Sequence, residues 1–142
     1  MLHSSSIRAQ AASTAVSLDS ERLDAYAAAL AFQPLASRLA QRLTGAFRDQ
    51  LDRAGLSIVL NLAEGVGRSQ PGEKARFYAI SRGSASECAA LVDVLRARGL
   101  AENSLCTEAR TLLVRIVQMT TGLEKAMRRR QERLSAGARR AG

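Results

Sequence analysis

Histidine, tryptophan and other aromatic residues are scarce in this chain of 142 residues, and their scarcity excludes several kinds of site. The sequence has one histidine, His3, no tryptophan, two tyrosines and three phenylalanines. Di-iron sites in helical bundles need Glu-x-x-His pairs that project inward, and activated cysteine or serine nucleophiles need a neighbouring base. With no histidine beyond position 3, the sequence predicts no metal site, no cofactor and no enzyme active site.

Cysteine and long apolar runs are also rare. Cys88 and Cys106 lie in apolar helical contexts without CxxC spacing, which favours buried free thiols in a reducing compartment over a disulfide or metal site. No apolar run reaches the ~18 residues that a membrane helix needs, and the N-terminus lacks the apolar core of a secretion signal. We therefore expect a cytoplasmic protein without a membrane partner.

What is abundant is helix-forming sequence. Runs rich in Ala, Leu, Arg, Glu and Gln predict an all-α fold. Apolar residues repeat at helical spacing in four segments, about 19–44, 46–66, 71–99 and 103–134. Short turns between these segments favour an antiparallel up-down-up-down four-helix bundle over residues 17–134. We also expect a disordered leader over 1–16, a disordered basic tail over 135–142, and a kink or break at Pro34.

The stretch 57–69 predicts the end of an apolar helix and a glycine-rich turn. Its Gly65-Val66-Gly67 element follows a helix and lacks both the GxGxxG and the GK[ST] completion, so a turn explains it better than a phosphate-binding loop. Asn61 and Glu64 are polar residues within this apolar helix and need partners if they are buried.

Those partners can be sought across the predicted hairpin. If the chain reverses near residue 70, facing residues have numbers that sum to about 140. This rule pairs Arg53 with Glu87, Ser57 with Arg82, and Glu64 with Arg76. We favour a polar network that fixes helix register over a surface groove for a ligand. The proposed network comprises Arg53, Asn61, Glu64, Arg82, Ser84 and Glu87.

The net charge of +8 is concentrated near the C-terminus, since residues 125–142 hold seven basic residues and one acidic residue. In an up-down-up-down bundle, the end of the fourth helix shares one end with the turn between the second and third helices. An anionic polymer could bind there, or the arginines could simply complement the helix dipole. The candidate phosphate-contacting residues are Arg68, Lys74, Arg76, Arg128, Arg129, Arg130 and Arg133.

Several short motifs in the second and third predicted helices carry a family resemblance. They are Ser57-Ile58, Asn61, Ala63-Glu64-Gly65, Gly67-Arg68, Arg82-Gly83-Ser84 and Glu87. The chain resembles the bacterial four-helix-bundle family typified by proteins encoded in intervening sequences of 23S ribosomal RNA genes. This family is related in fold to the accessory proteins of diversity-generating retroelements.

The resemblance implies a ring-like homopentamer with a basic surface suited to nucleic acid. One hypothesis is therefore a non-enzymatic, oligomeric nucleic-acid-binding protein, with RNA as the expected ligand. The other is a structural scaffold for a protein partner, with a reverse-transcriptase accessory subunit as one form of it, in which the basic tail serves solubility alone.

Overall fold

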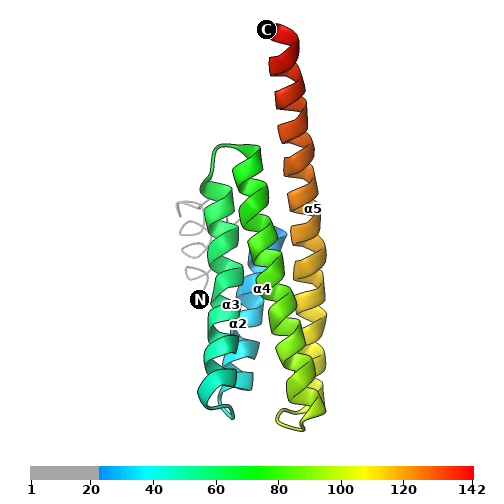
Figure 1. Cartoon of the computed structure of the whole chain (residues 1–142). Coiled ribbons are helices and arrows are strands. Elements are labelled where there is room, and N and C mark those ends of the chain that lie inside the picture. Colours follow the sequence, from blue (N-terminus) through cyan, green and yellow to red (C-terminus); the bar gives the residue numbers. More distant parts are fainter. Residues whose placement is uncertain (1–22) are drawn as a thin grey trace, which may run out of the picture.

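Four helices account for almost all of the described chain. The computed structural model describes residues 23–142, which form α2 (Asp24–Ala40), α3 (Gly45–Gly67), α4 (Pro71–Ala97) and α5 (Asn103–Ala141), with no strand in this range. The all-α class is therefore confirmed. The α3–α4 connection lies at one end of the molecule and the other two connections lie at the opposite end (Figure 1).

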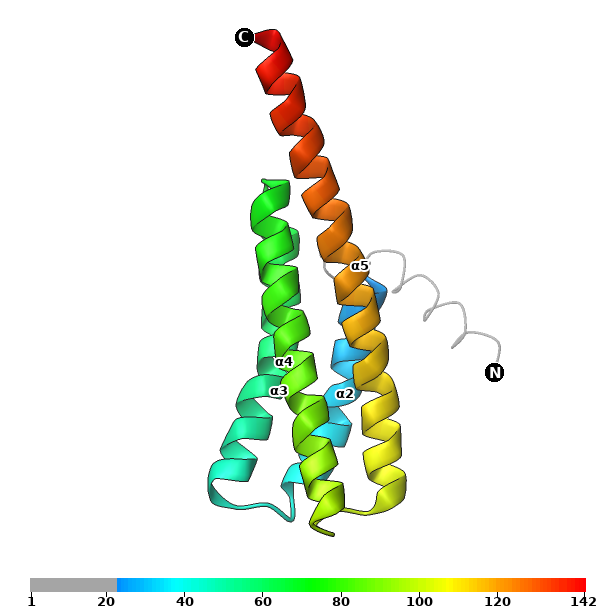
Figure 2. The ribbon, with the colours of Figure 1, turned by 45° about the vertical axis from the view of Figure 1, so that its right-hand side comes forward.

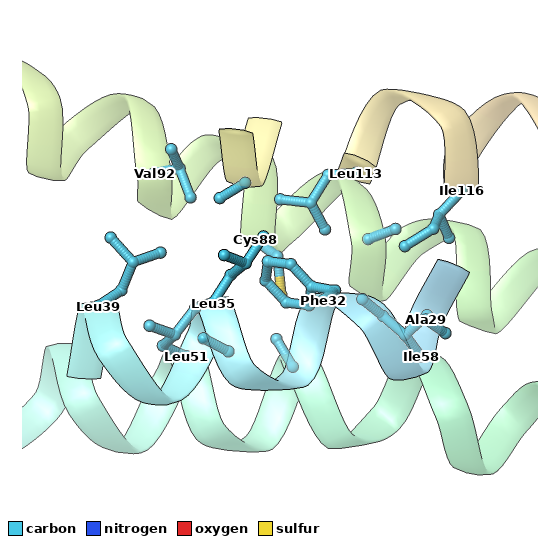
Figure 3. Close-up of a cluster of buried hydrophobic side chains, with 14 of the residues drawn as sticks. Ala29, Phe32, Leu35, Leu39, Leu51, Ile58, Cys88, Val92, Leu113 and Ile116 are labelled. Atoms are coloured by element: carbon cyan, nitrogen blue, oxygen red, sulfur yellow. The ribbon is translucent and has the colours of Figure 1, made fainter. Parts of the chain in front are cut away.

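Each helix has two neighbours, as expected of a four-helix bundle. Helix α2 packs against α3 and α5, and α4 packs against the same two helices. The apolar side chains that recur every three or four residues meet in the centre, where each contributes roughly 1.5–3 kcal/mol by burial. Figure 3 shows this core, which includes Phe32, Leu39, Leu51, Ile58, Cys88, Val92, Leu113 and Ile116.

The α3–α4 turn is tightly built. Pro71 occupies the start of α4, where a missing N–H leaves no hydrogen bond unmade. The Nζ of Lys74 donates hydrogen bonds to the carbonyl oxygens of Gly65 and Val66, at 3.3 and 2.7 Å. Lys74 thus satisfies carbonyls at the end of α3 that have no partner within that helix. The predicted turn is confirmed, and Lys74 helps to hold it.

Pro34 does not interrupt α2, so the expected break there was wrong. The helix runs unbroken from Asp24 to Ala40, with Pro34 inside it. Pro34 cannot donate a hydrogen bond to the carbonyl of Leu30. Both residues are exposed on the outer side of α2, so water can satisfy that carbonyl.

The C-terminal residues also differ from expectation. We expected the last helix to end near residue 134 and a disordered tail over 135–142, but α5 continues to Ala141. Alanine and arginine are strong helix formers and need no apolar partner to propagate a helix that is already started. The expected leader over 1–16 and the start of the first helix lie outside the described residues.

Candidate nucleic-acid interface

The polar residues between α3 and α4 form hydrogen bonds at the predicted level of the hairpin but with different partners. The hydroxyl groups of Ser57 and Ser84 are 2.7 Å apart, and the Nδ2 of Asn61 donates to the carbonyl oxygen and the Oγ of Ser57, both at 2.9 Å. Buried Ser81 donates to the carbonyl of Ile58 at 2.8 Å. Ser57 therefore pairs with Ser84, and its expected pairing with Arg82 was wrong.

The two expected charge pairs are also rearranged. Gln50 stands between Arg53 and Glu87: its Nε2 donates to Glu87 Oε1 at 2.9 Å, and its Oε1 accepts from Arg53. Glu64 forms its ion pair with Arg68, one turn further along α3, at 2.6 Å. Its expected pairing with Arg76 was therefore wrong. Residue numbers that sum to 140 give the same level along the bundle axis, but helix rotation decides which side chains face each other.

Arg82 belongs to a different cluster, centred on a residue that the sequence interpretation missed. It pairs with Glu124 of α5, which also accepts hydrogen bonds from Arg128 Nε and Nη2, at 3.0 and 2.9 Å. Glu124 is 8% exposed. Burial acts to raise its pKa, but the hydrogen bonds and charges of Arg128 and Arg82 outweigh burial and lower it.

The burial of Glu124 could have been predicted from the sequence. It follows Leu113, Ile116 and Thr120 at steps of three and four residues, which is the spacing of the buried side of α5. A carboxylate at such a position needs a cationic partner. Because α4 and α5 pack together, Arg82 of α4 provides one.

At the α3–α4 turn, two arginines flank an aromatic ring. The guanidinium carbon of Arg68 lies 4.9 Å from the ring centre of Phe77, and that of Arg76 lies 5.8 Å from it. These are cation–π distances. Arg76 is exposed and forms no ion pair with residues 23–142. The ammonium group of Lys74, in contrast, is hydrogen-bonded to carbonyl oxygens at the end of α3.

Helix α5 passes this turn and projects beyond it (Figure 2). The two elements touch where the backbone N–H of Gly72 donates to Gln131 Oε1 at 3.2 Å. Arg128 is held by Glu124, whereas Arg129, Arg130 and Arg133 are exposed and form no ion pair within the described chain. The structure thus brings both predicted basic groups to one end, and it leaves Arg76 of α4 and three arginines of α5 exposed without an ion pair among residues 23–142.

Exposed guanidinium groups that form no ion pair can bind phosphate oxygens through paired N–H donors. The described residues offer no comparable arrangement for metal chemistry, because no three His, Cys, Asp or Glu side chains gather among them. Cys88 and Cys106 are buried free thiols, as predicted.

The family comparison agrees with the motifs. The model of the family described as 23S rRNA-intervening sequence protein matches residues 21–122. The chain belongs to this family. The match includes Arg68, Lys74 and Arg76 of this family member but ends before the arginines of the projecting end of α5.

One further comparison and one property of the helices complete this description. A search of curated proteins found no match for the chain. No helix within residues 23–142 is long and apolar enough to cross a membrane.

Proposed function

We propose that this protein is a non-enzymatic, oligomeric nucleic-acid-binding protein that contacts the phosphate backbone of RNA through the projecting end of α5. The observation that carries the proposal is the set of exposed arginines at 129, 130 and 133, which form no ion pair within residues 23–142. The family description, which refers to 23S rRNA intervening sequences, supports RNA as the ligand.

The geometry favours backbone contacts over base recognition. Arginines that bind phosphates supply affinity but little sequence information. Binding to single strands usually relies on exposed aromatic rings, and Phe77 at this end is partly buried and flanked by two arginines. The placement of the three helix connections supports the up-down-up-down topology on which this shared end depends.

We also propose that copies of the chain associate as a homopentamer through the outer side of α3 and α4. Leu56 and Leu60 lie one turn apart on α3 and are 54% and 56% exposed, and Ile80 of α4 is 40% exposed. Contiguous exposed apolar side chains mark association surfaces. Helix α3 makes no contact with α5 in the described chain, so association centred on the exposed leucines of α3 leaves the arginines of α5 free for RNA in the cytoplasm.

Native mass spectrometry tests this association. The Leu56→Lys/Leu60→Lys double variant should dissociate into single chains while its circular dichroism stays helical. A wild-type protein that is a single chain at micromolar concentration would contradict the assembly without touching the RNA proposal.

The second candidate function is a scaffold for a protein partner such as a reverse transcriptase. The same exposed leucines favour it, because they could meet a different chain instead of a second copy. RNA binding and its salt dependence separate the two functions, since a scaffold needs neither.

The decisive experiment replaces three unpaired arginines near the projecting end of α5, Arg129→Gln/Arg130→Gln/Arg133→Gln. Each lost phosphate contact should reduce the slope of log affinity against log salt by roughly 0.7–0.9, so the triple variant should lose about 2.1–2.7 units of slope. The matched control is Arg38→Gln/Arg42→Gln/Arg48→Gln, which removes the same charge from exposed arginines near the α2–α3 connection. Equal losses in both variants, or no loss in the first, would contradict the proposed interface.

A further inference from the structure

A second group of arginines lies on α5 far from its projecting end. A shallow groove between α4 and α5 is lined by Arg96, Thr107, Arg110, Thr111, Val114 and Arg115. Its polar lining consists of guanidinium and hydroxyl groups. Among these lining residues, Arg110 donates a hydrogen bond from its Nε to Asp93 at 3.0 Å.

The donors of this groove are only partly used. Arg96 donates from Nη2 to Thr107 Oγ1 at 2.7 Å and to the carbonyl of Asn103 at 3.3 Å. The Nε of Arg96 is buried and has no hydrogen-bond partner among residues 23–142. Arg115 is exposed and forms no ion pair in the same range. The exposed guanidinium of Arg115 therefore gives this groove a donor group that an anion can reach, whereas the unpaired Nε of Arg96 lies below the surface.

The groove is aligned with the free arginines of the projecting end. Arg115 and Arg133 are eighteen residues apart, which is five whole turns of an α-helix at about 3.6 residues per turn. At about 100° per residue, Arg129 and Arg140 deviate from this direction by only about 40° and about 20°. These arginines therefore form one line along the outer side of α5, and helix α5 carries nine basic and three acidic residues in all.

We propose that the α4–α5 groove is a second phosphate-contact point for the same nucleic acid, which therefore lies along α5 as a duplex instead of crossing its end. This inference rests on the proposed function and names its substrate class. Arg115 and Arg133 are separated by about 27 Å along the helix axis at 1.5 Å per residue. An RNA duplex is A-form and rises about 2.8 Å per base pair, so about ten base pairs are needed to reach both contacts.

A stiff duplex suits this arrangement better than a single strand. Contacts held far apart on one straight helix favour a ligand that is itself straight over that distance, because a flexible strand must lose conformational entropy to span it. The duplex is also recognised through its phosphates and shape, which needs no stacking aromatic residues.

The test compares two RNA hairpins with the same loop and stems of about 6 and about 18 base pairs, because only the longer stem reaches both contacts. Arg115→Gln in the full-length protein should weaken binding to the longer stem by several fold and reduce its salt slope by about 0.9. It should leave binding to the shorter stem unchanged. Arg42→Gln is the matched control, because Arg42 is exposed near the α2–α3 connection and, like Arg115, forms no ion pair among residues 23–142.

The outcomes distinguish the second contact at Arg115 from the proposed function. If Arg115→Gln has no effect on the longer stem, or weakens both stems equally, the second contact is refuted. If a single strand of the same length shows the same dependence on Arg115, the duplex assignment is overturned. The proposed function falls separately, if the triple variant at 129, 130 and 133 binds both stems like the wild type.

Discussion

Gly65 provides a stability prediction that follows directly from the packing of α3 against α4. A Cβ at this position would lie 2.8 Å from Tyr78 Cε1 and 3.1 Å from Phe77 Cβ. Tyr78 is 4% exposed and the Phe77 Cβ is fixed to the α4 backbone, so neither atom can move without separating the helices. Overpacking of this kind costs about 1–3 kcal/mol, and the gain in helix propensity from Gly to Ala offsets about 1 kcal/mol of it.

We therefore expect Gly65→Ala to lose up to about 2 kcal/mol of unfolding free energy. Gly83→Ala is the matched control, because Gly83 is exposed in the middle of α4 with no atom within 4 Å of its would-be Cβ. That variant should gain about 0.5–1 kcal/mol. Urea unfolding followed by circular dichroism measures both, at several protein concentrations. If Gly65→Ala is as stable as Gly83→Ala, the close approach of the helices at Gly65 is refuted.

Three other residues give independent predictions. Glu124→Gln should lose about 1–3 kcal/mol at neutral pH, because Arg82 and Arg128 lose a buried anion. The folded-state pKa of Glu124 is lowered, so the stability difference between wild type and variant should be constant above about pH 5 and shrink as the pH falls below about 4. Urea unfolding at a series of pH values measures this difference. A stability difference that persists at about pH 2 would contradict the ion-pair explanation. Pro34→Ala should stabilise the protein by about 1–3 kcal/mol, because it restores a hydrogen bond in an unbroken helix; an unchanged unfolding midpoint would show that the proline is not strained there. Burial and, to a lesser extent, the charge of Glu87 raise the pKa of Cys88 to about 12. In a Cys106→Ala background, a thiol reagent at pH 8 should therefore label Cys88 of the folded protein about a thousandfold more slowly than Cys88 of the denatured protein. Comparable labelling rates in the folded and denatured protein would contradict the burial of Cys88.

Helix positions could be predicted from the sequence because one physical signal fixes them. The apolar repeat predicted helices over 46–66 and from Pro71, and the structure has α3 at Gly45–Gly67 and α4 from Pro71. The same signal failed for the last helix, where α5 continues to Ala141. Beyond the bundle there is no core to bury, so intrinsic propensity alone sustains the helix and the apolar pattern gives no warning of it.

Side-chain partners were predicted less well. The hairpin rule placed Ser57 opposite Arg82 of α4, whereas Ser57 bonds to Ser84, two residues further along that helix. Arg82 points instead toward Glu124 on α5, a helix that the rule did not consider. The level of a residue along the bundle axis follows from counting residues. The direction in which its side chain points depends on the rotation of its helix, which is set by packing against all neighbouring helices.

For the basic surface, the sequence predicted that the turn and the end of the last helix share one end, and the contact between Gly72 and Gln131 agrees with this. It did not predict that Lys74 is occupied by the end of α3. Nor did it predict that Arg128 is held by Glu124, because that carboxylate was not recognised as buried. Local competition for each cation appears only when the side chains are placed in three dimensions.

The most direct test of the central claim is an NMR titration of the arginine Nε–H signals with an RNA hairpin of about 18 base pairs, a stem long enough to pass both groups of arginines. Signals are assigned from single Arg→Gln variants. The account predicts that the signals of Arg129 and Arg133 shift at low salt and return as salt is raised, while those of Arg38 and Arg42 stay unchanged. Shifts confined to Arg38 and Arg42, or no shift at any arginine, would contradict nucleic-acid binding through α5.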